Sequence, residues 1–273
     1  MVIRELKNGN CFASTQEDHA ELSAQFAAHW GNDRFSRLRP YDSMVVATTF
    51  HDSGYREWEG SPPINLAKGR PYAHRETIPS FEAVELSAYG HNIDWLRSRD
   101  RYASLLVSMH RTGLWANRYD AFIHPKGRVR ERSPEVMAAK RALESQQEQE
   151  KNALGSGKEG FADELWFNFR ALQIFDMLSL YFCCDGYVAD EQLKEDLIAP
   201  VTLSYDSKEE VELNILPVGP KTVRFAPYPF DVSPLMVGVR ARLLPAGQFA
   251  SEAEGLAAYH KAARQLLTFA IVQ

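Results

Sequence analysis

Apolar positions repeat at helical spacing over the first two thirds of the chain and alternate near its end. The helical spacing predicts a first helix that begins after a cap at Thr15 and stops near Gly31. Further helices are expected over 41–54, over 81–113 as one or two helices, and over 162–184. Between 128 and 160 the composition becomes polar, which predicts a solvated helix followed by a flexible Gly-Ser segment.

Strand patterns occupy the two ends of the chain. Residues 2–14 predict a hairpin that turns near Gly9, and residues 201–244 predict several strands separated by Pro and Gly. A last helix is expected over 251–270. The chain is therefore predicted to be mainly α with a small antiparallel β-sheet appended, an α+β arrangement whose sheet the N-terminal hairpin can join.

This pattern divides the chain into a helical domain and an appendage. The helical domain is expected over 15–200, with a solvated insertion at about 128–160. The appendage comprises 201–273 and the hairpin 2–14, and it is expected to be β-rich with a terminal helix.

The composition is that of a globular protein with an ordinary core, since 45% of the 273 residues are hydrophobic. The formal net charge of −5 counts against a nucleic-acid partner. The most apolar stretch, 175–184, is too short to span a bilayer, and the N-terminal residues lack the apolar run of a signal peptide. Three cysteines offer no disulfide framework, so we expect a cytoplasmic protein without a membrane partner. The sequence leaves open whether the protein forms a homo-oligomer.

Ionisable residues interrupt the predicted buried helices. His51 and Asp52 end the second helix, His110 lies in the third helical range, and Asp176 lies in the most apolar stretch. A buried carboxylate without a partner costs several kcal/mol. A divalent cation satisfies carboxylate oxygens and neutral imidazole nitrogens together, which indicates a metal site. His19 shares the inward face of the first helix and is a further candidate ligand.

Two glycines suggest where the histidines lie in their helices. Gly54 and Gly113 each follow a histidine by three positions. Glycine commonly ends a helix, so both imidazoles are predicted in a last helical turn.

Each residue also has an interpretation without a metal. His51 would stabilise a helix C-terminus, and His110 would bond to a core carbonyl. Asp176 would form a buried ion pair with Arg170 or Arg111.

The order of these residues resembles that of the HD-domain superfamily of metal-dependent phosphohydrolases. An early His, an adjacent His-Asp pair and a late Asp on an apolar helix carry the resemblance. The strings HDSGYREWEGSP, LLVSMHRTGL and APYPF resemble, within that superfamily, a bacterial family of unknown function related to HD domains. The resemblance implies an HD-domain-like helical core.

The resemblance also implies one or two divalent metal ions, drawn from Mn, Fe, Co, Ni, Zn or Mg. His19, His51, Asp52 and Asp176 would hold the first ion. A second ion would lie on His110, with His91 as an additional candidate, and the paired aspartate would bridge the two ions.

The sequence departs from the superfamily pattern in two places. The gap from His110 to Asp176 is long, at 66 positions (176 − 110). The basic residue often found after the His-Asp-x-Gly turn is absent, and Tyr55 stands there, followed by Arg56. Arg56 is then the candidate to neutralise a substrate anion.

The expected function is hydrolysis of a small anionic phosphoester or nucleotide, with Asp52 binding the metal and orienting the attacking water. Two alternatives stay open, namely a diiron oxygenase-like protein and a non-catalytic binding or assembly module. The remaining histidines and the run RVRER are expected on the surface or in loops: His29, His74, His124, His260 and 128–132.

Overall fold

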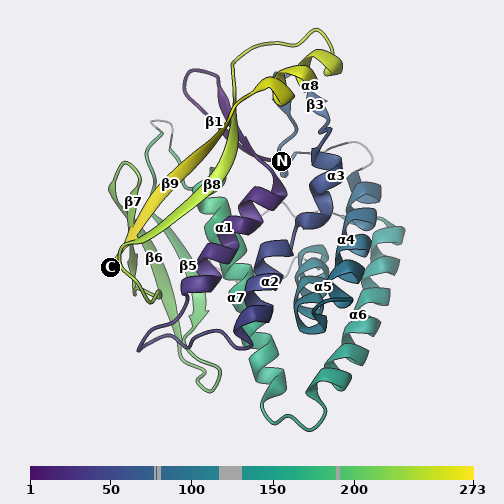
Figure 1. The fold of residues 1–273 in the computed structure, drawn as a ribbon, viewed down its shortest axis with the longest axis vertical. Coiled ribbons are helices and arrows are strands. Elements are labelled where there is room, and N and C mark those ends of the chain that lie inside the picture. Colours follow the sequence, from purple (N-terminus) through teal and green to yellow (C-terminus); the bar gives the residue numbers. More distant parts are fainter. Residues whose placement is uncertain (77, 79–80, 117–130, 189–190) are drawn as a thin grey trace.

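A computed structural model gives the fold and describes all residues except 77, 79–80, 117–130 and 189–190 (Figure 1). The helices are α1 (Gln16–His29), α2 (Tyr41–Phe50), α3 (Arg56–Glu59), α4 (Phe81–Arg97), α5 (Arg101–Trp115), α6 (Pro134–Gly155), α7 (Phe161–Leu180) and α8 (Glu252–Lys261). A 3₁₀ turn, η1 (Ser53–Tyr55), follows α2, and a π-helical turn, η3 (Tyr181–Asp185), follows α7. The strands are β1 (Val2–Glu5), β2 (Cys11–Ser14), β3 (Ile64–Asn65), β4 (Arg70–Pro71), β5 (Asp196–Thr202), β6 (Glu210–Gly219), β7 (Thr222–Ala226), β8 (Leu235–Leu244) and β9 (Arg264–Val272).

Helix α1 begins at the predicted cap. The Thr15 hydroxyl accepts a hydrogen bond from the Asp18 backbone amide, and the Asp18 carboxylate accepts one from the Thr15 backbone amide. This reciprocal pair satisfies amides that the helix itself leaves without partners. The apolar face of α1, with Leu22 and Phe26, is fully buried.

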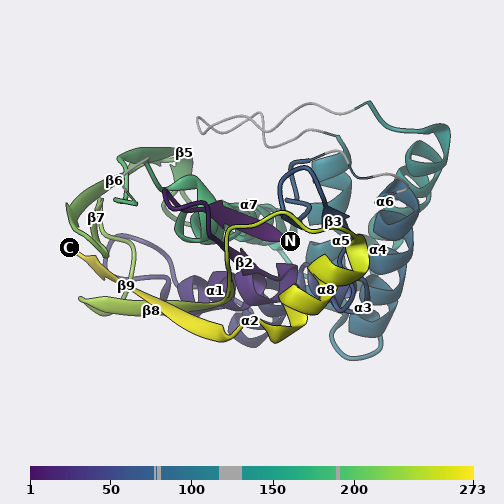
Figure 2. The same cartoon turned by 90° about the horizontal axis from the view of Figure 1, so that it is seen from above.

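The sheet is larger than the sequence predicted and is mixed. Seven strands follow the order β1-β2-β8-β9-β7-β6-β5, and all neighbours are antiparallel except β7 and β9, which are parallel. The sheet curls around one side of the molecule (Figure 2). The prediction of a mainly α protein with a small antiparallel sheet appended is therefore wrong, and the fold is α/β. The N-terminal hairpin joins the sheet through the pairing of β2 with β8, as expected.

The largest local correction concerns the C-terminal segment. The helix expected over 251–270 ends at Lys261, and Arg264–Val272 forms strand β9 between β7 and β8. Its side chains alternate, because Leu267 and Phe269 are buried whereas Leu266 is exposed. An apolar run of this length fits either period, so its nonlocal sheet partners decide the structure.

The central helices connect the sheet to the outer helices. Helix α1 contacts β8, α2 and α7, and α5 contacts α2, α4, α6 and α7. Figure 1 shows α4, α5 and α6 on the side of the molecule opposite the sheet. One continuous hydrophobic core includes residues of both the helices and the sheet. None of the described helices is both long and apolar enough to cross a membrane.

The two glycines near the predicted histidines do not end helices. Gly54 lies in η1, and Gly113 lies inside α5, which continues to Trp115. A Cβ on Gly54 would lie 2.2 Å from the carbonyl oxygen of Ala88, and one on Gly113 would lie 3.2 Å from the ring of Phe169. Both glycines therefore allow close packing between elements and are not helix caps, although His51 itself does end α2 as predicted.

Candidate metal centre

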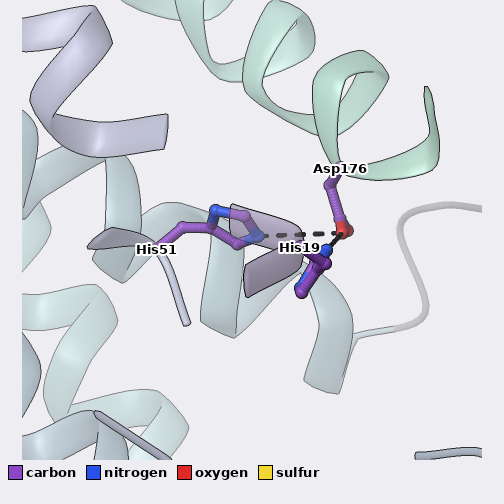
Figure 3. A group of neighbouring side chains, drawn as sticks. All are labelled: His19, His51 and Asp176. Carbon is purple, nitrogen blue, oxygen red and sulfur yellow. Dashed lines mark ion pairs between the residues drawn. The ribbon is translucent and has the colours of Figure 1, made fainter. Parts of the chain in front are cut away.

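Four separate segments bring their ionisable residues to one buried place. Helix α1 contributes His19, the α2–η1 junction contributes His51 and Asp52, α5 contributes His110 and α7 contributes Asp176. All five residues are at most 6% exposed. Figure 3 shows His19 and His51 with Asp176, which reaches toward them from the neighbouring helix. The structure thus brings together five of the six residues predicted as metal ligands.

Carboxylate oxygens and imidazole nitrogens face each other across this cluster. Asp52 Oδ2 lies 3.1 Å from His19 Nε2 and 3.9 Å from His51 Nε2. Asp176 Oδ1 lies 3.8 Å from His19 Nδ1 and 3.7 Å from His51 Nε2, as the dashed lines in Figure 3 mark. Asp176 Oδ2 lies 3.9 Å from His110 Nε2.

The hydrogen bonds of His51 fix which of its nitrogens faces the carboxylates. Its Nδ1 lies 2.8 Å from the carbonyl oxygen of Thr48, which can only accept, so Nδ1 donates. In the neutral imidazole the lone pair is then on Nε2. That atom is buried and has no hydrogen-bond partner among the described residues. A metal-binding histidine usually donates a hydrogen bond from one ring nitrogen, here Nδ1, and binds the ion with the other, here Nε2.

His19 is oriented in the same way. The Ser179 hydroxyl donates to the carbonyl oxygen of Asp176 at 2.7 Å, so the serine oxygen accepts from His19 Nδ1 at 2.8 Å. Nε2 of the neutral ring is then unprotonated and faces Asp52 Oδ2 at 3.1 Å. Two lone pairs repel each other at that distance unless a cation or a proton lies between them.

The pKa directions in the cluster favour ionised carboxylates, which a cation needs as ligands. Burial raises the pKa of Asp52, but His51, His19 and Arg111 outweigh it and hold that pKa well below its ordinary value. Burial likewise opposes ionisation of Asp176, and its imidazole neighbours again hold the pKa low. Burial lowers the pKa of His110 to about 4, which leaves this ring neutral near pH 7. Burial also opposes protonation of His51, but Asp52 and Asp176 raise its pKa overall.

The donor set fits a divalent ion. One ligand atom from each of His19, His51 and Asp176 lies within 4.8 Å of the others, and the same holds for His51, Asp52 and His110. Imidazole nitrogens mixed with carboxylate oxygens suit Mn, Fe, Co, Ni or Zn. These buried His and Asp groups can therefore hold a metal.

A second layer of buried residues surrounds Asp52. The Tyr89 hydroxyl donates a hydrogen bond to Asp52 Oδ1, and Arg111 Nη2 lies 3.6 Å from the same oxygen. Arg111 Nη1 donates to Glu85 at 2.8 Å, and Arg132 donates to the other oxygen of Glu85 at 3.2 Å. Arg111 therefore pairs with Asp52 and Glu85.

Two predicted site residues lie outside the cluster. His91 is exposed on α4 and does not share the centre. The side chain of Arg56 is 65% exposed and pairs with Glu17, its Nε donating at 3.1 Å. The Glu17 carboxylate raises the pKa of Arg56, which keeps this guanidinium charged at the surface.

Several residues near the centre were missed from the sequence. Tyr89 and Glu85 stand in α4 without a pattern that marks them, although a buried carboxylate such as Glu85 signals a buried cation. Arg132 was predicted to be solvated, but its side chain is only 10% exposed because Glu85 binds it.

His74 was predicted to lie on the surface or in a loop, and it lies in a turn, where it is half-buried. Its ring nitrogens are shielded from solvent, and burial lowers its pKa well below the ordinary value. The positive charges of Arg75 and of the N-terminal ammonium group lower this pKa further. His124 lies outside the described residues.

Comparison with known proteins identifies a family and no activity. No curated protein and no solved structure matches the chain. One family model matches residues 1–246, a range that includes all five clustered residues. The chain belongs to this family, which is described as "Protein of unknown function (DUF3891)".

Proposed function

We propose that the protein is a metal-dependent phosphohydrolase of the HD type that acts on a small phosphoester or nucleotide. One observation carries the proposal. In their neutral form, His19 and His51 direct the lone pairs of their Nε2 atoms at the carboxylates of Asp52 and Asp176, and a bound cation would relieve that repulsion. The order of these residues along the chain is also that of the HD superfamily.

Each clustered residue has a role in this proposal. His19, His51, Asp52, Asp176 and His110 would hold the ion, with Thr48 and Ser179 fixing two of the rings. A divalent ion supplies two things when bound, a lowered pKa of water and neutralisation of phosphate oxygens. Asp52 would bind the ion, and Asp176, whose pKa its imidazole neighbours hold low, would accept a hydrogen bond from the attacking water and so orient it.

A positive charge next to Asp52 comes from Arg111 rather than from Arg56. Arg111 is buried 3.6 Å from Asp52, whereas Arg56 is exposed and bound to Glu17. Arg111 adds to the stronger effects of His51 and His19, which together hold the pKa of Asp52 well below its ordinary value.

We propose that the protein acts in the cytoplasm on a small anionic substrate. Cys11, Cys183 and Cys184 are free thiols, which suits a reducing cytoplasm. A small anionic substrate suits a centre that gains positive charge on binding a divalent ion. The net charge of −5 gives no reason to expect a nucleic acid as partner.

Elemental analysis followed by a phosphoester screen tests the proposal. The purified protein is expected to contain a stoichiometric transition metal and, with added Mn, Ni or Fe, to hydrolyse at least one small phosphoester or nucleotide. Asp52→Ala is expected to lose both properties. His91→Ala is the matched control, because this exposed residue lies apart from the cluster, and it should keep both. Retention of metal and activity by Asp52→Ala would reject the proposal.

A further inference from the structure

The two carboxylate oxygens of Asp52 have different surroundings. Oδ2 faces the imidazoles, at 3.1 Å from His19 Nε2 and 3.9 Å from His51 Nε2. Oδ1 faces the opposite way, where it accepts the Tyr89 hydroxyl and lies 3.6 Å from Arg111 Nη2. One oxygen is therefore directed at the candidate metal and the other is already bound by protein donors.

Tyr89 and Arg111 are themselves held in place. The guanidinium carbon of Arg111 lies 3.2 Å from the ring centroid of Tyr89, so the two side chains stack. The Tyr89 ring also packs edge-on against buried Tyr55, with centroids 5.4 Å apart. Arg111 Nη1 donates to Glu85 at 2.8 Å. Neither donor can leave Oδ1 without breaking other buried contacts.

Glu85 anchors this arrangement from the outside. Besides Arg111, it accepts hydrogen bonds from Trp115 Nε1 at 3.3 Å and from Arg132 Nη1 at 3.2 Å. Glu85 is 4% exposed, and its carboxylate needs both guanidinium charges nearby. The chain from Arg132 through Glu85 and Arg111 to Asp52 is thus a continuous buried network.

A carboxylate that bridges two metal ions binds one ion with each oxygen. At Oδ1 of Asp52 a second ion would have to displace the Tyr89 hydroxyl and would approach the positive charge of Arg111, which electrostatic repulsion opposes. A second ion would also lack further protein ligands among the described residues. His91 is exposed, and the five clustered residues offer about the number of donors that one transition-metal ion takes.

We infer that Tyr89 and Arg111 reserve Oδ1 of Asp52, so that the centre holds a single metal ion to which Asp52 binds through Oδ2 alone. This inference rests on the metal centre proposed above. It makes Tyr89 and Arg111 positioning residues, since they act through Asp52. It also separates the proposed hydrolysis from the diiron alternative, because oxygen activation of that type requires two ions.

Metal titration of the wild-type protein tests the number of ions. Metal-free protein is titrated with Mn²⁺, bound metal is measured by elemental analysis, and the electron paramagnetic resonance spectrum is recorded. One Mn²⁺ per chain with an uncoupled spectrum is the expected result. Two ions per chain with exchange coupling would overturn this inference but leave the metal centre standing. No bound ion at all would overturn both.

Tyr89→Phe tests the positioning role. This variant removes the hydroxyl from Oδ1 but keeps the ring on which Arg111 stacks. Loss of a residue that hydrogen-bonds to a metal ligand typically weakens metal binding by about 10–100-fold. We expect a rise of that size in the dissociation constant for Mn²⁺. An unchanged dissociation constant would contradict the role of Tyr89.

Tyr102→Phe provides the matched control. Tyr102 is also a buried tyrosine, but its hydroxyl accepts from Asn168 at 2.7 Å and does not contact the cluster. It should lose some stability while keeping the wild-type affinity for Mn²⁺. Equal losses of affinity in both variants would mean that Tyr89 acts only through general stability, and this too would overturn the inference.

Discussion

The imidazole rings of His51 and His110 lie edge to face, with centroids 5.1 Å apart and an interplanar angle of 79°. The two rings come from different segments of the chain, and both Nε2 atoms lie within 4 Å of the Asp176 carboxylate. Two buried imidazolium ions at this separation would repel each other strongly. The carboxylate charges are therefore better balanced by one shared cation than by protons on both rings.

A shared cation should stabilise the folded protein. Because the unfolded chain has no assembled site, we expect Mn²⁺ at about 100 times its dissociation constant to add about 2.7 kcal/mol to the free energy of unfolding. Asp176→Asn keeps the shape of the side chain but removes its charge, so most of this gain should disappear. Thermal unfolding with increasing Mn²⁺ measures the effect. An equal gain in Asp176→Asn would place the ion elsewhere.

Replacing Arg111 should cost more stability than replacing Arg56, because Arg111 is buried at the centre and Arg56 is exposed. Arg111→Ala leaves buried Glu85 and Asp52 with less compensating charge, and such a change costs about 3–5 kcal/mol of stability. Arg56→Ala removes an exposed pair with Glu17, which is worth about 1 kcal/mol or less. Urea unfolding measures both, and the metal content of Arg56→Ala should equal that of the wild type. A larger loss for Arg56→Ala would reverse the assignment of the two residues.

The cluster of buried histidines and aspartates was predictable from sequence because ionisable residues stand out within apolar helices. His110 and Asp176 each interrupt a run of buried residues, and His51 and Asp52 follow a helix of mostly apolar or small residues; burial of such groups demands a common partner. The cluster thus follows from local pattern combined with one physical requirement.

The surrounding network was not predictable in the same way. Arg132 stands in a polar run that predicts a solvated segment, but its side chain donates to buried Glu85 in α4 and is only 10% exposed. Arg56 occupies the expected place after the His-Asp turn, yet α3 directs it to Glu17. Such ion pairs depend on how elements distant in sequence pack together, so the spacing of residues along the chain does not predict them.

Acid should destabilise the protein partly through Glu76. Partial burial raises the pKa of Glu76, but hydrogen bonds from Arg70, Lys68 and the Ala73 amide outweigh it and lower the pKa from 4.5 to about 2. As the pH falls, the unfolded chain therefore takes up this proton first. The contribution of Glu76 to stability is fully present above about pH 4.5 and is lost as the pH falls toward about 2.

Glu76→Gln isolates this contribution from those of the other carboxylates. The variant should be less stable than the wild type at pH 7, and the difference between the two should shrink steadily below pH 4.5. Urea unfolding of the metal-free proteins at several pH values measures it. A difference that stays constant down to about pH 2 would show that Glu76 is not held ionised by its partners.

The C-terminal segment offers a direct test of strand against helix. In strand β9, Phe269 is 2% exposed and packs on Phe182 with ring centroids 5.0 Å apart, whereas Leu266 points away from the core and is 62% exposed. Phe269→Ala should cost about 3–5 kcal/mol through the lost contacts and the cavity left behind. Leu266→Ala should change stability by about 0.5 kcal/mol at most. In a helix, positions 266 and 269 would share one face, so comparable losses from the two substitutions would favour the helix that the sequence pattern suggested.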